Sequence, residues 1–258
     1  MPRIATWNVN SINARLANVL EWLRSVRPDV VLLQEIKCQD PAFPTEAVGD
    51  LGYNVATHGQ KSYNGVAILS LRPLEDVVSG LPGDPLDEQA RYLEASTWGL
   101  RVASIYLPNG NPLGTEKFTY KLAWMQRLRV HAAALLELDE PVVLGGDFNV
   151  IPEPVDCHDP KAWLGDALFQ PESRRAFRAL LHLGFTESYR ALHPDQRGAY
   201  TFWDYQRGAF QLDHGIRIDH LLLSPQAADR LVGCTIDKDP RRQPKASDHT
   251  PVIVELRD

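Results

Sequence analysis

The stretch IATWNVNSINARLANVLEWLRSVRPDVVLLQE, residues 4–35, decides how the fold begins. Two short runs of β-forming residues, Ile4 to Trp7 and Val30 to Leu33, enclose a segment from Leu16 to Val26 whose apolar residues recur at helical spacing. The pattern predicts a strand, a helix and a second strand.

The rest of the chain continues this alternation. Further strands are predicted at Tyr53 to Thr57, Gly65 to Leu69, Tyr92 to Thr97, Val102 to Tyr106, Val142 to Leu144, Ile218 to Leu223 and Val252 to Leu256. Helices are predicted from Thr115 to Leu138 and from Glu172 to Leu183, the second ending near Gly184. Hairpin-like strand pairs mixed with strand-helix units indicate an α/β fold with two packed, largely antiparallel sheets and helices outside.

Composition is typical of one domain spanning residues 1–258. A chain of this length with 44% hydrophobic residues can bury a full core. Cys38, Cys157 and Cys234 lack the close spacing of zinc or redox sites, which indicates reduced thiols. No signal-peptide pattern and no run of about 18 apolar residues is present. We therefore predict a cytoplasmic protein with no membrane partner.

The net charge of -6 argues at first against a nucleic-acid partner, because Lys and Arg contacts to phosphate supply much of the affinity for DNA. Net charge does not describe the distribution of charge over the surface. If acidic residues are gathered around a cation, the basic residues can still form a local phosphate-binding face.

Polar side chains follow several of the predicted strands at the point where each strand ends. They are Asn8 with Asn10, Glu35, Tyr106 with Asn109, and Asp147 with Asn149. Ser247-Asp248-His249 stands just before the last strand. Side chains at strand ends can converge on one rim of a sandwich, where a rigid scaffold holds them.

Each of these residues taken alone has an ordinary explanation. Glu35 can be the first solvated residue past a strand, and Asp147 with Asn149 can form a turn. Asn8 and Asn10 can be turn or cap residues, and Tyr106 a half-buried strand aromatic. Asp219 is harder to explain in this way, because an unsatisfied buried polar group costs roughly 2 to 7 kcal/mol.

Their joint occurrence in order resembles the exonuclease III branch of the endonuclease/exonuclease/phosphatase superfamily. The motifs are Trp7-Asn8-Val9-Asn10, Leu33-Gln34-Glu35, Tyr106-Leu107-Pro108-Asn109-Gly110, Gly146-Asp147-Phe148-Asn149, Arg217-Ile218-Asp219-His220 and Ser247-Asp248-His249. Thr201-Phe202-Trp203-Asp204-Tyr205 is similar to that branch in particular. Ile36 and Asn10 depart from the family pattern, where threonine and aspartate are common.

The resemblance implies a four-layered α/β sandwich and a metal-dependent DNA repair nuclease. Members cleave duplex DNA 5′ to abasic sites, remove nucleotides from 3′ ends and clear blocked 3′ ends. Carboxylate and amide oxygens suit Mg²⁺, with Mn²⁺ as a second choice. We expect a monomer acting on double-stranded DNA.

The resemblance also assigns roles to single residues. It places Glu35 as the main metal ligand with Asn8 and Asn10 beside it, and Asp248 supporting the metal side through Asn8 or Glu35. Asp147 would activate the attacking water and Asn149 would hold it. His249, backed by Asp219, would contact the scissile phosphate, and Tyr106 and Asn109 would hold phosphate oxygens. DNA contacts are predicted at Lys61, Asn109, Arg217 and Lys245, a pocket for the base-free sugar at Phe202, Ile216 and Ile218, and stacking on DNA at Trp203.

Two other functions stay open. A phosphatase of the same superfamily would keep the metal and His-Asp core but should lack the apolar sugar pocket. A DNA-binding protein without catalysis should have lost at least one core residue, and none is missing. A Ser-His-Asp hydrolase is disfavoured because no serine lies in a Gly-x-Ser-x-Gly pattern.

Overall fold

The computed structural model describes residues 1–258, which form two six-stranded sheets. The first sheet has the order β11(Leu231–Ile236), β12(Val252–Leu256), β1(Arg3–Asn8), β2(Val30–Gln34), β4(Val66–Ser70), β3(Asn54–His58). The second has the order β5(Glu75–Ser79), β6(Tyr92–Thr97), β7(Leu100–Tyr106), β8(Val142–Asp147), β10(Asp219–Leu223), β9(Thr186–Glu187). All nine predicted strands are present, and the two-sheet α/β prediction is confirmed.

Each sheet contains one parallel pair made by a strand-helix-strand unit. Helix α1(Leu16–Val26) connects β1 to β2, and α3(Glu116–Leu136) connects β7 to β8. The remaining strand pairs are antiparallel. The other helices are α2(Thr45–Gly49), α4(Pro171–Leu181), α5(Ser188–Leu192) and α6(Pro225–Ala228), with 3₁₀ turns at Asp40–Ala42, Pro154–Asp156, Pro160–Trp163 and Pro240–Arg242.

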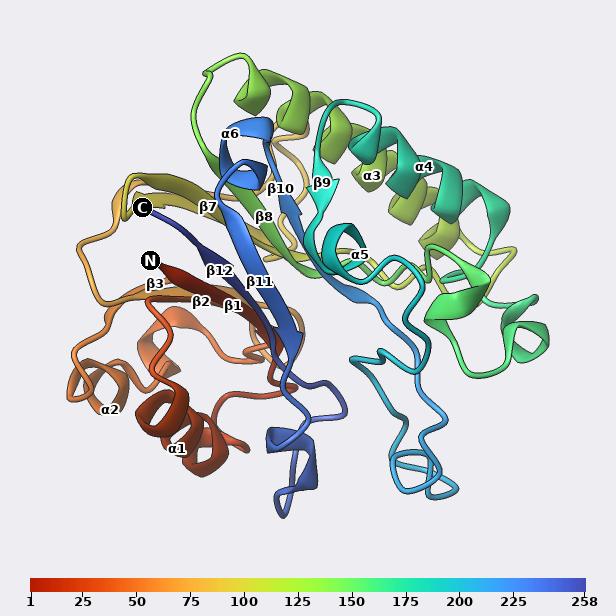
Figure 1. The fold of residues 1–258 in the computed structure, drawn as a ribbon, viewed down its shortest axis with the longest axis horizontal. Helices are drawn as coiled ribbons and strands as arrows, with labels where there is room; N and C mark the ends of the chain where they lie inside the picture. Colours follow the sequence, from red (N-terminus) through yellow and green to blue (C-terminus); the bar gives the residue numbers. More distant parts are fainter.

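The alternation of side chains along the strands builds four layers. In β1, Ile4 packs between the two sheets while its neighbour Ala5 packs toward α1 with Trp22. In β7, Val102 lies between the sheets while Ala103 packs toward Trp124 of α3. Figure 1 shows α1 and α2 on the outer side of one sheet and α3 and α4 on the outer side of the other. No helix of the chain is long and apolar enough to span a membrane.

The two sheets approach each other closely at the carboxyl ends of their parallel strands. A Cβ atom on Gly145 of β8 would lie 2.6 Å from the side chain of Leu32 on β2 and 3.6 Å from Cβ of Thr6 on β1. Because glycine at 145 has no side chain, β8 can lie close to β1 and β2 of the other sheet. The polar residues that follow these strands therefore meet at one rim.

Three strands of the structure were not predicted from the sequence. The edge strand β5 is exposed along its whole length, so it shows no buried face for a periodicity to reveal. Strand β11 has a register shift between Leu231 and Gly233, which interrupts its alternation. Strand β9 has only two residues.

Candidate active site

Three potential metal ligands meet at the rim between the sheets. Glu35 follows β2, Asp147 ends β8, and His249 lies in the segment that leads into β12. One oxygen or nitrogen of each residue lies within 4.8 Å of the others. Three residues that are far apart in the sequence thus form one cluster, as the positions at strand ends predict.

Asn8, the last residue of β1, bridges the two carboxylates of this cluster. Its Nδ2 donates to Glu35 Oε1 at 2.8 Å and to Asp147 Oδ2 at 3.0 Å. Its Oδ1 accepts from the backbone N–H of Asn10 at 3.0 Å, which fixes the orientation of the amide. In this arrangement Asn8 holds the acids together through its nitrogen and directs its oxygen away from them.

His249 is held by a buried carboxylate on its far side. Its Nδ1 lies 2.8 Å from Asp219 Oδ2, and its Nε2 lies 3.7 Å from Asp147 Oδ2. The second oxygen of Asp219 is buried with no hydrogen-bond partner. The predicted pairing of His249 with Asp219 therefore exists, and the free ring nitrogen is directed at the acid cluster.

The charges of the site act strongly on one another. Burial alone lowers the pKa of His249, but the negative charges of Asp219 and Asp147 outweigh it and raise this pKa to about 10. Burial raises the pKa of Asp147, opposed by the charge on His249. Burial also opposes ionisation of Glu35, yet hydrogen bonds from Asn8 and Lys37 bring its pKa below the usual value. Glu35 is therefore an anion and His249 a cation at neutral pH.

The end of β7 and the loops after β7 and β8 bring three further predicted residues to the cluster. Tyr106, Asn109 and Asn149 line the same pocket as Glu35 and Asp147. Burial and the charges of Glu35 and Asp147 raise the pKa of Tyr106, so its phenol keeps its proton. Asn109 Nδ2 donates to Asn149 Oδ1 at 3.1 Å, and the backbone N–H of Asn149 donates to Asp147 Oδ1 at 2.9 Å. The two asparagines and the acid thus form one bonded unit.

Asp248 is connected to the acids differently from the prediction. Its Oδ1 accepts from Asn10 Nδ2 at 3.1 Å, and no hydrogen bond joins it to Asn8 or Glu35. Lys37 lies between the two sides, with its Nζ 2.6 Å from Asn10 Oδ1 and 2.8 Å from Glu35 Oε2. Asp248 is therefore linked to Glu35 indirectly, through Asn10 and Lys37 on one side and through Ser247, which bonds the main chain of Asn8, on the other, instead of by the expected direct contact.

The donor set fits a hard divalent cation. Carboxylate oxygens of Glu35 and Asp147, on the scaffold that Asn8 fixes, are the ligands that Mg²⁺ prefers. Glu35 is ionised and 16% exposed, so a cation can reach it. No cysteine belongs to the cluster, which argues against a thiolate zinc site.

The cluster lines a pocket whose wall is polar on the side of Glu35, Asp147 and His249 and carries a patch of apolar side chains as well. It has a volume of about 360 Å³, and the predicted residues Phe202, Ile216 and Ile218 line it. Trp163 and Leu168 also line the pocket with apolar side chains, and neither was predicted from the sequence. The remaining polar residues of the lining are Asn111, Asp166, Asp204 and His214. These residues lie in loops without periodicity. The only signal in the sequence was the apolar character of Trp163 and Leu168.

Two predicted DNA contacts are buried instead. Arg217 is 1% exposed, and its guanidinium pairs with Asp156 at 2.9 Å and with Glu187 at 2.8 Å. Trp203 is 0% exposed, and its Nε1 donates to Asp213 Oδ1 at 3.0 Å. Arg217 cannot reach a phosphate and Trp203 cannot stack on a base in this structure, so both predictions are corrected.

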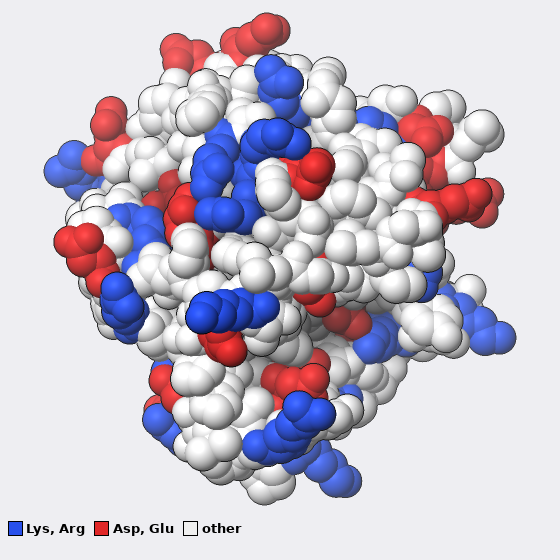
Figure 2. All heavy atoms as spheres, turned by 90° about the vertical axis from the view of Figure 1, so that its right-hand side faces the viewer, with Lys and Arg blue, Asp and Glu red and all other residues white.

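The other two predicted basic contacts are exposed. Lys61 lies in the segment between β3 and β4, and Lys245 lies shortly before Ser247. Lys245 lines a basic cleft together with Arg15, Arg241 and Tyr205, and this cleft has no acidic lining residue. Tyr205 OH accepts hydrogen bonds from Arg15 and from Asn10, so the cleft adjoins the acid cluster. In the view of Figure 2, one group of Lys and Arg side chains lies together in the upper half, and further basic and acidic side chains are scattered over the rest of the face.

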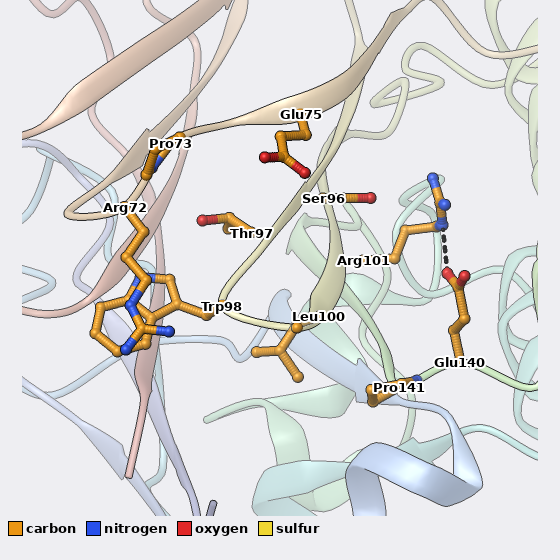
Figure 3. A pocket seen from close by; sticks show the side chains of 11 residues that line it. Arg72, Pro73, Glu75, Ser96, Thr97, Trp98, Leu100, Arg101, Glu140 and Pro141 are labelled. Carbon is orange, nitrogen blue, oxygen red and sulfur yellow. Dashed lines mark hydrogen bonds and ion pairs between the residues drawn. The ribbon is translucent and has the colours of Figure 1, made fainter.

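A larger hollow of about 440 Å³ lies at the opposite end of the strands, where β7 and β8 begin (Figure 3). There the guanidinium of Arg72 lies 3.8 Å from the ring centroid of Trp98, and Arg101 pairs with Glu140. These three charged side chains of the hollow are thus paired or stacked, and Glu75 has no ion-pair partner there. It holds no group of three metal-ligating side chains, so the rim site remains the candidate.

Comparison with known proteins points to the same site. Residues 5–249 match the model of the endonuclease/exonuclease/phosphatase family. The chain is similar to exodeoxyribonuclease III of Haemophilus influenzae, with 34% identity over 99% of this chain and 100% of the relative. All the residues of the acid cluster lie inside the matched range.

Two solved structures share the fold. An AP endonuclease from Archaeoglobus fulgidus superposes with a TM-score of 0.95 and 40% identity, covering 99% of each chain. The 3′ phosphatase NExo from Neisseria, bound to a product DNA hairpin, gives a TM-score of 0.97 and 39% identity over 100% of both chains. The likeness therefore extends over the sheets, the outer helices and the rim loops.

Proposed function

Because the chain belongs to the endonuclease/exonuclease/phosphatase family, we propose that its Glu35, Asp147 and His249 cluster hydrolyses phosphodiester bonds of DNA. The chain is a DNA repair nuclease of the exonuclease III type, with AP endonuclease activity and activity on 3′ ends. The observation that carries the assignment of the reacting groups is the convergence of the three ligand atoms within 4.8 Å in a pocket that also contains the apolar side chains of Phe202, Ile216 and Ile218.

Family members depend on a metal ion, and we propose that Mg²⁺ binds here. Glu35 would hold it, with Asp147 beside it and Asn10 and Asp248 on the outer side. A bound divalent cation supplies positive charge that stabilises the negative oxygens of the pentacoordinate phosphate. The side chains of the chain itself perform the remaining steps.

The geometry of the side chains supports a division of roles. Asp147 accepts the proton of the attacking water, because its Oδ1 is fixed by the backbone of Asn149 while Oδ2 faces His249. His249, kept protonated by Asp219, donates from Nε2 to a non-bridging phosphate oxygen. Tyr106 and Asn109 donate to the other phosphate oxygens, and Asn149 helps to orient the water. As the water oxygen bonds to phosphorus, the bond from phosphorus to the 3′ oxygen breaks, and that oxygen leaves and takes up a proton from solvent.

The pocket next to these groups suits a sugar without a base. Phe202, Ile216 and Ile218 supply an apolar surface within about 360 Å³, and a sugar that lacks its base can turn into it at low cost. We propose that the exposed Lys61 and Lys245 contact the DNA backbone on either side. These contacts give affinity and orientation without reading sequence.

The decisive experiment uses a duplex with one tetrahydrofuran abasic analogue and a second duplex with a recessed 3′ end. We expect a cut 5′ to the analogue and shortening of the 3′ end in Mg²⁺, and neither in EDTA. A protein that is folded and leaves both duplexes intact in Mg²⁺ would refute the proposed function.

The phosphatase alternative predicts a different result with the same protein. Release of phosphate from an inositol phosphate or a phosphorylated lipid, with no cut in either duplex, would favour it. The apolar patch in the pocket disfavours this alternative, because a highly charged inositol phosphate gains nothing from Phe202, Ile216 and Ile218. We also propose that one domain and one copy of the chain suffice, and that the protein acts in the cytoplasm.

A further inference from the structure

Helix α3 carries a lysine that is sealed from solvent. Lys121 is 0% exposed, and its Nζ donates to the main-chain oxygen of Asn109 at 3.0 Å and to that of Asn149 at 2.5 Å. Neither acceptor is a carboxylate. Burial of an ammonium without a direct ion-pair partner is strongly unfavourable, so packing alone does not explain a lysine here.

The two acceptors belong to the loops that carry the reacting groups. Asn109 follows β7 and Asn149 follows β8, the two parallel neighbours of the second sheet. The side chains of the two asparagines are bonded to each other, and Asn149 is bonded through its backbone to Asp147. Lys121 thus links the main chains of the two loops, and the side chains of Asn109 and Asn149 link the same loops a second time in the site.

The stem of Lys121 has little freedom to move. A Cβ atom at Gly110 would lie 2.6 Å from Lys121 Cδ and 3.2 Å from Ala167 Cβ. The loop after β7 therefore packs directly on the stem, and only glycine permits this approach. Burial lowers the pKa of Lys121 to about 7, even though the nearby negative charges of Asp147 and Asp166 act in the opposite direction.

We propose that Lys121 is a positioning residue that holds the Asn109 and Asn149 loops, and through them Asp147, in register for attack on the phosphodiester. The inference rests on the proposed nuclease function of this site. Without the ammonium, two buried carbonyl oxygens lose their donor and the loops can separate. A displacement of about 1 Å at reacting groups can cost on the order of a hundredfold in rate.

The test compares Lys121→Met, which keeps most of the stem and removes the charge, with Arg129→Met. Arg129 lies exposed on the same helix, two turns farther along. We expect Lys121→Met to lower kcat on the abasic duplex by roughly tenfold to a hundredfold, with the Kd for DNA in EDTA within about twofold of the original. Arg129→Met should retain full kcat. Unchanged kcat in a folded Lys121→Met protein would overturn the inference.

A double-mutant cycle with Asn109→Ala separates positioning from general weakening of the fold. If Lys121 acts through the asparagine pair, Lys121→Met should lower kcat much less in the Asn109→Ala background than in the original chain. Equal losses in both backgrounds would show a merely structural role and would overturn the inference.

A second variant applies if Lys121→Met does not fold. Lys121→Gln is polar but one bond shorter, so its amide is too short to bond both carbonyl oxygens, and reduced kcat with unchanged Kd in this variant would support the inference. Full kcat would overturn it. Failure of the proposed function itself is distinguishable, because the unmutated chain would then leave the abasic duplex intact in Mg²⁺.

Discussion

His249 and Asp219 face each other across the two sheets, with Nδ1 2.8 Å from Oδ2. Asp219 begins β10 of the second sheet, whereas His249 lies just before β12 of the first. The pair is buried, so its attraction is weakly screened by water. One contact therefore both links the sheets at the rim and sets the charge of the imidazole.

Asp219→Asn should lower the pKa of His249 well below the value of about 10 that the charged pair produces. The neutral amide no longer favours the imidazolium, while burial still disfavours it. Imidazole NMR signals of the metal-free protein in EDTA, followed against pH, measure the change. The exposed Asp195→Asn variant serves as the control. An unchanged His249 titration would contradict the assigned pairing.

Glu35→Gln should raise the Mg²⁺ concentration needed for half-maximal cleavage by about tenfold or more. The amide retains the size of the side chain but loses the charge that attracts the cation. A titration of the cleavage rate with Mg²⁺ measures the shift, and Glu46→Gln, at an exposed position on α2, is the matched control. Superimposable titrations of the Glu35 variant and the original chain would speak against Glu35 as a metal ligand.

Asp147→Asn and His249→Ala should each lower kcat by roughly 10² or more while leaving the Kd for DNA nearly unchanged. The first variant loses the group that accepts the proton of water, and the second loses the donor to the phosphate. Single-turnover cleavage with saturating enzyme separates the chemical step from binding. Full single-turnover activity in either variant would refute the proposed mechanism.

The sequence predicts the rim well because strand ends determine where side chains meet. Asn8, Glu35, Tyr106 and Asp147 each end or directly follow a strand of a parallel pair, so their convergence follows from the topology. The edge strand β5 has no buried face, so its sequence shows no alternation of apolar and polar residues from which a strand could be predicted. Trp163 ends the 3₁₀ turn Pro160–Trp163 and Leu168 lies in the loop after it, where no pattern relates sequence position to the pocket.

The prediction that Arg217 contacts DNA was wrong for a physical reason, and part of that reason can be seen in the sequence. Successive residues of an extended chain point to opposite sides, so an arginine between Ile216 and Ile218 of the pocket faces away from that pocket. The same alternation turns Trp203 away from the side that Phe202 faces. The partners that hold Arg217, Asp156 and Glu187, come from distant segments and follow only from the tertiary structure.

Arg217→Met should destabilise the fold rather than weaken DNA binding. Burial opposes ionisation of Glu187, but Arg217 outweighs it and lowers the pKa of Glu187 to about 2. Because this folded-state pKa lies below the unfolded value, the stabilisation is present above about pH 4.5 and is lost as the pH falls toward 2. Removal of one partner of a buried pair costs about 3 to 5 kcal/mol.

Urea unfolding at pH 7 and pH 4 measures this effect, and the loss relative to the original chain should be larger at pH 7. The Kd of Arg217→Met for duplex DNA should stay unchanged at a temperature where it is folded. Lys245→Met should instead weaken DNA binding and reduce the salt slope by about 1 with no loss of stability, because Lys245 is exposed beside the basic cleft. Weaker DNA binding by a folded Arg217→Met protein would restore the arginine as a DNA contact.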